Sequence, residues 1–335
     1  MELLDLPVEI IDEIICHTLP SDFEAFALCC RAIYTRAASK IARHNSLKQR
    51  WRCTIIGYKD RGDILRILCE IASDPLVGRY IESLSLCRRG GGPNVDTKND
   101  KFRSNQEVME SIKNMVLQSE CFDNAGVDAQ LWWEDVLREI EPHTKDGDDQ
   151  YDDDAVHMTV SLLGQLPNLQ TLQLPSGWYR LRGRWNVNPD AKKRLIAVLD
   201  AMVETANSSC DQDQALGKLR IILPSTEEGY EERVSFQVLD SFMRLRSLEE
   251  LYSTSCVASD DGYTGIPFQW RFPGMNSNLR RVELTYCCMD AAGISVLLTH
   301  TPLLSVFRYL HECKWCVTSM YKLHVRHLLT LSTNA

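Results

Sequence analysis

The feature that most constrains this chain is a spacing of apolar residues that recurs along most of its length. The pattern L-x-x-L-x-L, in which other apolar residues can replace leucine, has six approximate matches after residue 80. Within each match the apolar residues alternate as they do in a strand with one buried face, so the sequence predicts six short strands of one repeated type. The matches are Ile81/Leu84/Leu86, Leu169/Leu172/Leu174, Leu216/Leu219/Ile221, Leu248/Leu251/Ser253, Leu279/Val282/Leu284 and Leu304/Phe307/Tyr309.

The spacing between these matches is irregular. Successive matches start 88, 47, 32, 31 and 25 residues apart. Leucine-rich repeats usually have a period of about 20–29 residues, so most of these units must contain extra chain. The long first interval predicts an insertion at about residues 88–160, with helices over 103–121 and 128–141. The expected fold class is therefore mixed α/β, with a leucine-rich-repeat-like solenoid and helical insertions over residues 56–335.

Two cysteines strengthen the repeat interpretation. In leucine-rich repeats an Asn or Cys stands three residues after the last apolar position of the strand. Cys256 and Cys287 take this place in the fourth and fifth units. Residues 292–300 then carry apolar side chains at helical spacing and are followed by Pro302, so the fifth unit predicts strand, turn, helix and strand in succession.

The first 55 residues have a different pattern and predict three compact helices. Pro7 suits the first turn of a helix, where its missing N–H group costs nothing. A second apolar stripe extends from Phe23 to Tyr34, and a third predicted helix ends near Trp51. The first stripe consists of Ile10, Ile11, Ile14 and Ile15.

The order of residues in this N-terminal part resembles the F-box. The run Leu6-Pro7-Val8-Glu9-Ile10-Ile11 is followed by Asp22-Phe23-Glu24-Ala25-Phe26-Ala27-Leu28-Cys29-Cys30-Arg31, and the likeness covers about residues 4–52. The rest of the chain is similar to the leucine-rich bodies that fungal-type F-box proteins carry. Residues 1–55 are therefore expected to be an F-box-like module, and residues 56–335 a body that binds a target.

The resemblance implies a function and a set of contact residues. F-box helices dock an adaptor of the Skp family, which connects them to cullin and RING subunits of a ubiquitin ligase, while the body selects an unidentified protein substrate. The alternative is a non-catalytic scaffold that acts with the adaptor without ubiquitin transfer. The residues expected to contact the adaptor are Leu6, Pro7, Glu9, Ile10, Ile11, Ile14 and Leu28.

A run of basic and aromatic residues is the candidate target-binding segment. Arginine side chains there could hold an acidic or phosphorylated segment, or the run could be a solvated loop. The net charge of −9 and the pI near 5.5 favour a protein target over nucleic acid. The candidate residues are Trp178, Arg180, Arg182, Arg184 and Trp185.

No residue pattern predicts an enzyme, a cofactor or a metal. Cys313-x-x-Cys316 stands near His324 and His327, but the spacing does not suit a zinc site. The acidic residues 146–152 lack the glycine and the final glutamate of a calcium loop. Nucleophile-elbow, P-loop and H-E-x-x-H motifs are also missing from the sequence.

Composition limits the compartment. The first residues contain acids where a secretory signal needs Lys or Arg, and no stretch reaches the ~18 apolar residues of a membrane span. The 13 cysteines are an odd number and include two adjacent pairs, which is awkward for a disulfide framework. The sequence predicts a protein of the cytoplasm or nucleus with reduced thiols and no membrane partner.

Overall fold

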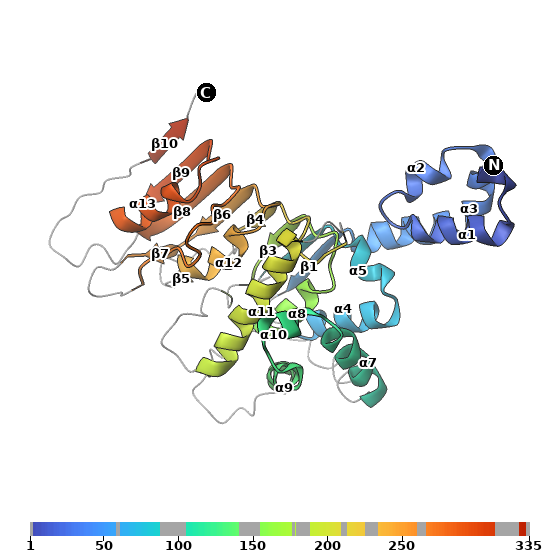
Figure 1. Cartoon of the computed structure of the whole chain (residues 1–335), viewed down its shortest axis with the longest axis horizontal. Helices are drawn as coiled ribbons and strands as arrows, with labels where there is room; N and C mark the ends of the chain where they lie inside the picture. The colour runs from blue at the N-terminus through green and yellow to red at the C-terminus, as the bar shows by residue number, and fades with distance from the viewer. Residues whose placement is uncertain are drawn as a thin grey trace.

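A computed structural model gives the fold (Figure 1). It describes residues 3–57, 61–87, 105–140, 155–175, 178, 188–208, 213–224, 234–259, 266–311 and 328–332. The chain is mixed α/β with a largely parallel sheet, as the sequence predicted. No helix in the described residues is both long and apolar enough to cross a membrane.

The main sheet contains one strand for each repeat match. Its order is β1 (Cys53–Gly57), β2 (Ser83–Cys87), β3 (Thr171–Gln173), β4 (Ile221–Leu223), β6 (Glu250–Thr254), β8 (Arg281–Met289) and β9 (Val306–His311), all parallel. β10 (Leu328–Ser332) pairs with β9 in the antiparallel sense. The second half of β8 joins β7 (Cys256–Ala258) and β5 (Val234–Ser235) in a smaller parallel sheet.

The central apolar residues of the repeats form one continuous row across the main sheet. Each is at most 2% exposed, so this row is the spine of the hydrophobic core. The register joins Leu84, Leu172, Ile222, Leu251, Val282 and Phe307.

The register corrects the third predicted match. Ile222 pairs with Leu172, so the repeat reads Leu219-x-x-Ile222, three residues later than predicted. Ile221 points to the opposite face and is half-buried, because side chains alternate along a strand. The interval from Leu219 to Leu248 is then 29 residues, within the usual period of such repeats.

Two buried cysteines lie side by side where the repeat pattern placed them. Cys256 and Cys287 are both fully buried, and the Cys256 backbone N–H donates to the Cys287 sulfur over 3.3 Å. Ser255 and Tyr286, which precede them, both have a positive φ, near 59° and 55°. The turn after the strand therefore repeats from one unit to the next. Burial raises the pKa of the Cys287 thiol well above its usual value, which makes this thiol a structural group.

Most helices of the body lie on one side of the main sheet (Figure 1). The predicted helices at 103–121, 128–141, after Asn188, and at 292–300 are confirmed with shifted ends as α7, α9, α11 and α13. The described helices are α4 (Arg61–Ser73), α5 (Leu76–Tyr80), α7 (Gln106–Leu117), α8 (Cys121–Ala125), α9 (Ala129–Ile140), α10 (Val156–Leu163), α11 (Pro189–Ser208), α12 (Asp240–Met243) and α13 (Ala291–Thr299), with a 3-10 turn, η3, at Phe236–Leu239.

The N-terminal helices project from the β1 end of the sheet (Figure 1). They are η1 (Leu3–Asp5), α1 (Val8–His17), α2 (Phe23–Ala27) and α3 (Arg31–Trp51). The predicted second helix from Phe23 to Tyr34 was wrong. The chain is extended at Cys30, with φ −158° and ψ 160°, so Tyr34 belongs to α3. Pro7 is the N-cap of α1 and lies just outside its first turn.

Candidate docking surface on the N-terminal helices

The isoleucine stripe of α1 divides between the core and the solvent. Ile11 and Ile15, four residues apart on one face of the helix, are 2% and 1% exposed and belong to the hydrophobic core. Ile10 is 43% exposed, and Ile14 is half-buried. Only one face of α1 therefore packs inside the molecule, and the neighbouring face presents isoleucine to the solvent.

Exposed apolar side chains gather on these helices. Ten large hydrophobic side chains are notably exposed in the described residues, and half of them fall before residue 35. Such a concentration in a tenth of the chain marks a docking site, because scattered single residues are the norm elsewhere. We call this set the N-terminal apolar surface. It comprises Leu3 at 38% exposed, Val8 at 45%, Ile10 at 43%, Leu28 at 72% and Tyr34 at 50%.

The predicted adaptor-contact residues fall into three groups. Pro7, Glu9, Ile10 and Leu28 are exposed, and Leu6 and Ile14 are half-buried at the same helices. Ile11 is corrected: at 2% exposure it holds α1 on the module's own core and has no surface to offer a partner.

The N-terminal helices are held to the body by a buried imidazole. His44 of α3 is 2% exposed; its Nδ1 lies 2.8 Å from the Tyr80 hydroxyl of α5, and its Nε2 lies 3.1 Å from a Glu24 oxygen. Lys48 donates to the same Glu24 oxygen over 2.7 Å, and the hydrogen bonds from Lys48 and His44 lower the pKa of Glu24. Burial raises the pKa of Tyr80 to about 12, so its hydroxyl stays protonated. The module is therefore anchored through hydrogen bonds as well as apolar contacts.

The predicted target-binding segment is only partly within the described residues. Trp178 is corrected: it is 1% exposed, donates its indole N–H to the Val238 carbonyl over 3.3 Å and packs against Phe242. It is a core residue and cannot stack on a ligand. Arg180, Arg182, Arg184 and Trp185 lie outside the described residues, as do the Cys313/Cys316 pair and the acidic residues 146–152.

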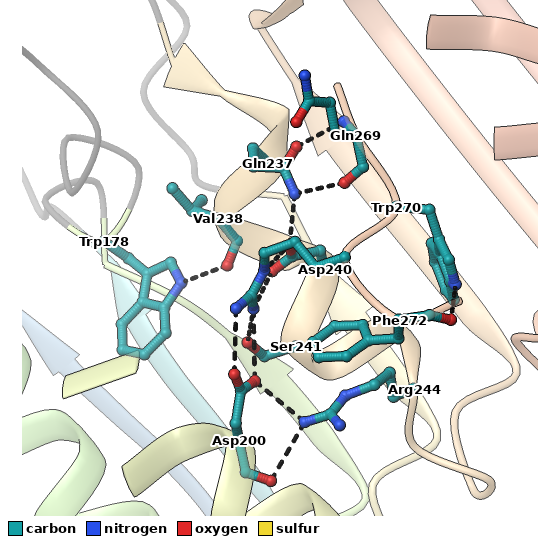
Figure 2. A network of polar contacts seen from close by, with 11 residues as sticks. Trp178, Asp200, Gln237, Val238, Asp240, Ser241, Arg244, Gln269, Trp270 and Phe272 are labelled. Atoms are coloured by element: carbon teal, nitrogen blue, oxygen red, sulfur yellow. Dashed lines mark hydrogen bonds and ion pairs between the residues drawn. The ribbon is translucent and has the colours of Figure 1, made fainter. Parts of the chain in front are cut away.

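A buried polar network beside Trp178 was not foreseen from the sequence (Figure 2). Arg271 donates to both carboxylate oxygens of Asp240, to Asp200 over 3.1 Å and to the Ser241 hydroxyl over 2.9 Å. Arg244 donates to Asp200 over 3.0 Å. Burial alone would lower the pKa of Arg271, but its bonds to Asp240 and the charges of both acids raise it.

This network connects α11, α12 and residues 269–272 and has no surplus charge for a ligand. Two guanidinium groups face two carboxylates, and both guanidinium groups also lie over the Phe272 ring, at 3.7 Å from Arg244 and 4.7 Å from Arg271. A cavity of about 20 Å³ beside it, lined in part by Trp178 and Leu199, has room for about one water molecule. The arrangement is an internal clamp. Its members are 40 and 31 residues apart along the chain, so no local motif could have revealed it.

A second buried network fastens the helical insertion. The His157 Nδ1 lies 2.7 Å from Glu139, while its Nε2 lies 3.4 Å from the Ala191 carbonyl and 3.8 Å from Asp135. Both ring nitrogens face acceptors, which suits the doubly protonated imidazolium. Burial alone would lower the pKa of His157, but the hydrogen bond and charge of Glu139 and the charge of Asp135 raise it. Arg194 of α11 also pairs with Asp135 over 2.5 Å, so α9, α10 and α11 meet at this cluster.

No group of His, Cys, Asp and Glu side chains suited to a metal ion occurs in the part of the chain that the structure describes. Compared with protein-family models, with curated proteins and with solved structures, the chain matches none. The N-terminal apolar surface is therefore the feature of this molecule with the clearest functional content.

Proposed function

We propose that the chain is a non-catalytic substrate-recognition subunit of an SCF-type cullin–RING ubiquitin ligase, acting in the cytoplasm or nucleus. The N-terminal helices dock a Skp-family adaptor, and the body holds a target protein. The observation that carries this proposal is the N-terminal apolar surface, which coincides with the F-box-like residues between Leu6 and Leu28. Exposed apolar groups at this density are stabilised when a partner covers them.

The body supports the second half of the proposal as an irregular leucine-rich-repeat solenoid. Its parallel strands carry the repeat residues in one register row, and Cys256 and Cys287 are buried at the position that such repeats give to Asn or Cys. The sheet face opposite this core carries polar and charged side chains. Solenoids use such continuous faces to bind partners. Examples are Glu250, Tyr252, Arg281, Glu283 and Arg308.

The central test removes the apolar contacts at the start of α1. A Leu6→Ala/Pro7→Ala variant should bind a Skp-family adaptor at least about tenfold more weakly, because truncating a central interface anchor commonly costs about 2 kcal/mol or more. It should keep its helical circular dichroism, because Pro7 is exposed and donates no backbone hydrogen bond. Binding is measured by titration calorimetry against purified adaptor.

A matched control is available on the body. Leu131 of α9 is 41% exposed, so Leu131→Ala removes a similar apolar group outside the N-terminal apolar surface and should leave adaptor binding unchanged. Near wild-type affinity of the folded Leu6→Ala/Pro7→Ala variant would refute docking at this surface.

The alternative function is a scaffold that works with the adaptor without ubiquitin transfer. Both functions use the same surface, so co-purification separates them. Recovery of adaptor, cullin and RING subunits together supports the ligase receptor, whereas adaptor without cullin supports the scaffold.

A further inference from the structure

The N-terminal helices are strongly polarised in charge. Residues 1–30 contain seven acidic residues and no Lys or Arg, whereas residues 31–52 contain seven Lys or Arg residues and no acid. The acidic half includes α1 and α2, and the basic half is α3 with the residue after it. The N-terminal apolar surface lies largely on the acidic half, since Leu3, Val8, Ile10 and Leu28 all precede residue 31.

Ion pairs with the body consume much of the positive charge on the basic half. Arg43 pairs with Asp74 over 2.6 Å, Arg50 with Glu70 over 2.7 Å, and Arg52 with Glu82 over 2.8 Å. These acids belong to the body and not to α1 or α2. The cations that they neutralise are consequently unavailable to compensate the acids around the apolar surface.

Few acids of the acidic half are paired. Glu24 is bound by Lys48, and Asp12 is 56% exposed with Arg36 at 3.8 Å. Glu9 and Asp22 are exposed and form no ion pair within the described part of the chain.

Local helix stability accounts for only part of this pattern. Glu9 lies in the first turn of α1, where the helix dipole favours a negative charge. Asp22 is the N-cap of α2, yet its side chain accepts no capping hydrogen bond. Capping therefore does not explain the carboxylate at that position, which faces solvent next to the docking helices.

We infer that the partner of the N-terminal apolar surface carries Lys or Arg side chains around its apolar groove, so that charge attraction speeds and orients docking. This inference rests on the proposed function and names the chemistry of the partner's contact face. Apolar anchors set how long a complex lasts, while charges at the rim mainly set its association rate and its sensitivity to salt. A surface with unpaired acids would be repelled by an acidic groove.

The test measures association rates of the full chain with a recombinant Skp-family adaptor by surface plasmon resonance. The wild-type association rate should fall about tenfold between low and high NaCl, because salt screens attraction over a Debye length. A Glu9→Lys/Asp22→Lys variant should associate about tenfold more slowly at low salt and lose most of the salt dependence. Circular dichroism verifies its fold, and the milder Glu9→Gln/Asp22→Asn variant should show a smaller effect in the same direction.

Glu134→Lys is the matched control, because Glu134 is an exposed acid on α9 of the body. It should associate like the wild type. If the adaptor binds but the rate ignores salt and both charge variants, or if the reversed variant binds faster, the inferred basic rim is refuted while apolar docking stands. If the wild-type chain does not bind the adaptor at any salt concentration, the proposed function fails together with the inference.

Discussion

The N-terminal helices and the body of this protein treat solvent in opposite ways. On the N-terminal helices, apolar side chains such as Leu28 are left 72% exposed. In the body, charged groups such as Asp240 are 2% exposed and fully engaged with partners. An exposed leucine leaves the fold intact and remains free to bind, whereas a buried charge is tolerated only with its partners in place. The first region is thus built for a partner, and the second for one fixed internal arrangement.

The largest effect expected from breaking this contrast comes from the buried network. Arg271→Ala leaves the Asp240 carboxylate, only 3% exposed, without its main cation. Such a loss should lower the free energy of unfolding by about 3–5 kcal/mol, measured by urea denaturation.

Arg308→Ala provides the comparison for that measurement. Arg308 is 54% exposed and pairs with Glu283 over 3.3 Å, so its removal should cost at most about 1 kcal/mol. Similar losses from both substitutions would show that the network around Arg271 is no more than a surface ion pair.

The next effect compares two adjacent isoleucines of α1. Ile11→Ala should lower the free energy of unfolding by about 2–4 kcal/mol, because it opens a cavity in the core. Ile10→Ala should change stability by less than about 1 kcal/mol, because Ile10 is 43% exposed, yet it should weaken adaptor binding. Thermal unfolding and calorimetry measure the two quantities on the same variants. The reverse assignment would mean that α1 is rotated from the orientation described.

The smallest effect concerns pH. The pKa of His157 is raised in the folded state above its ordinary value near 6.5, so its contribution to stability is complete below that value. This contribution is lost as the pH rises through the folded-state pKa. The stability difference between wild type and His157→Gln should therefore shrink from about pH 6 to about pH 9 in urea denaturation curves. A difference that grows over this range would exclude the doubly protonated imidazole.

Local sequence patterns were sufficient for most of the strands and several helices. The repeat spacing located the strands around Leu84, Leu251 and Val282, because alternating burial depends only on nearest neighbours along the chain. The same reasoning placed α13 between β8 and β9. It failed at the third repeat, where Leu216, Leu219 and Ile222 offer two overlapping registers, and pairing with β3 selects one of them.

What the sequence by itself determined about this protein is its sequence of elements, its mixed α/β class and an N-terminal apolar stripe larger than α1 could bury. Only the tertiary structure decided which side of that stripe faces outward, because Ile10 and Ile11 fit it equally well until α1 packs on its neighbours. It also decided that Trp178 is a core residue and that Arg271 meets Asp200, 71 residues away. Contacts of that separation have no local signature, since packing alone brings the residues together.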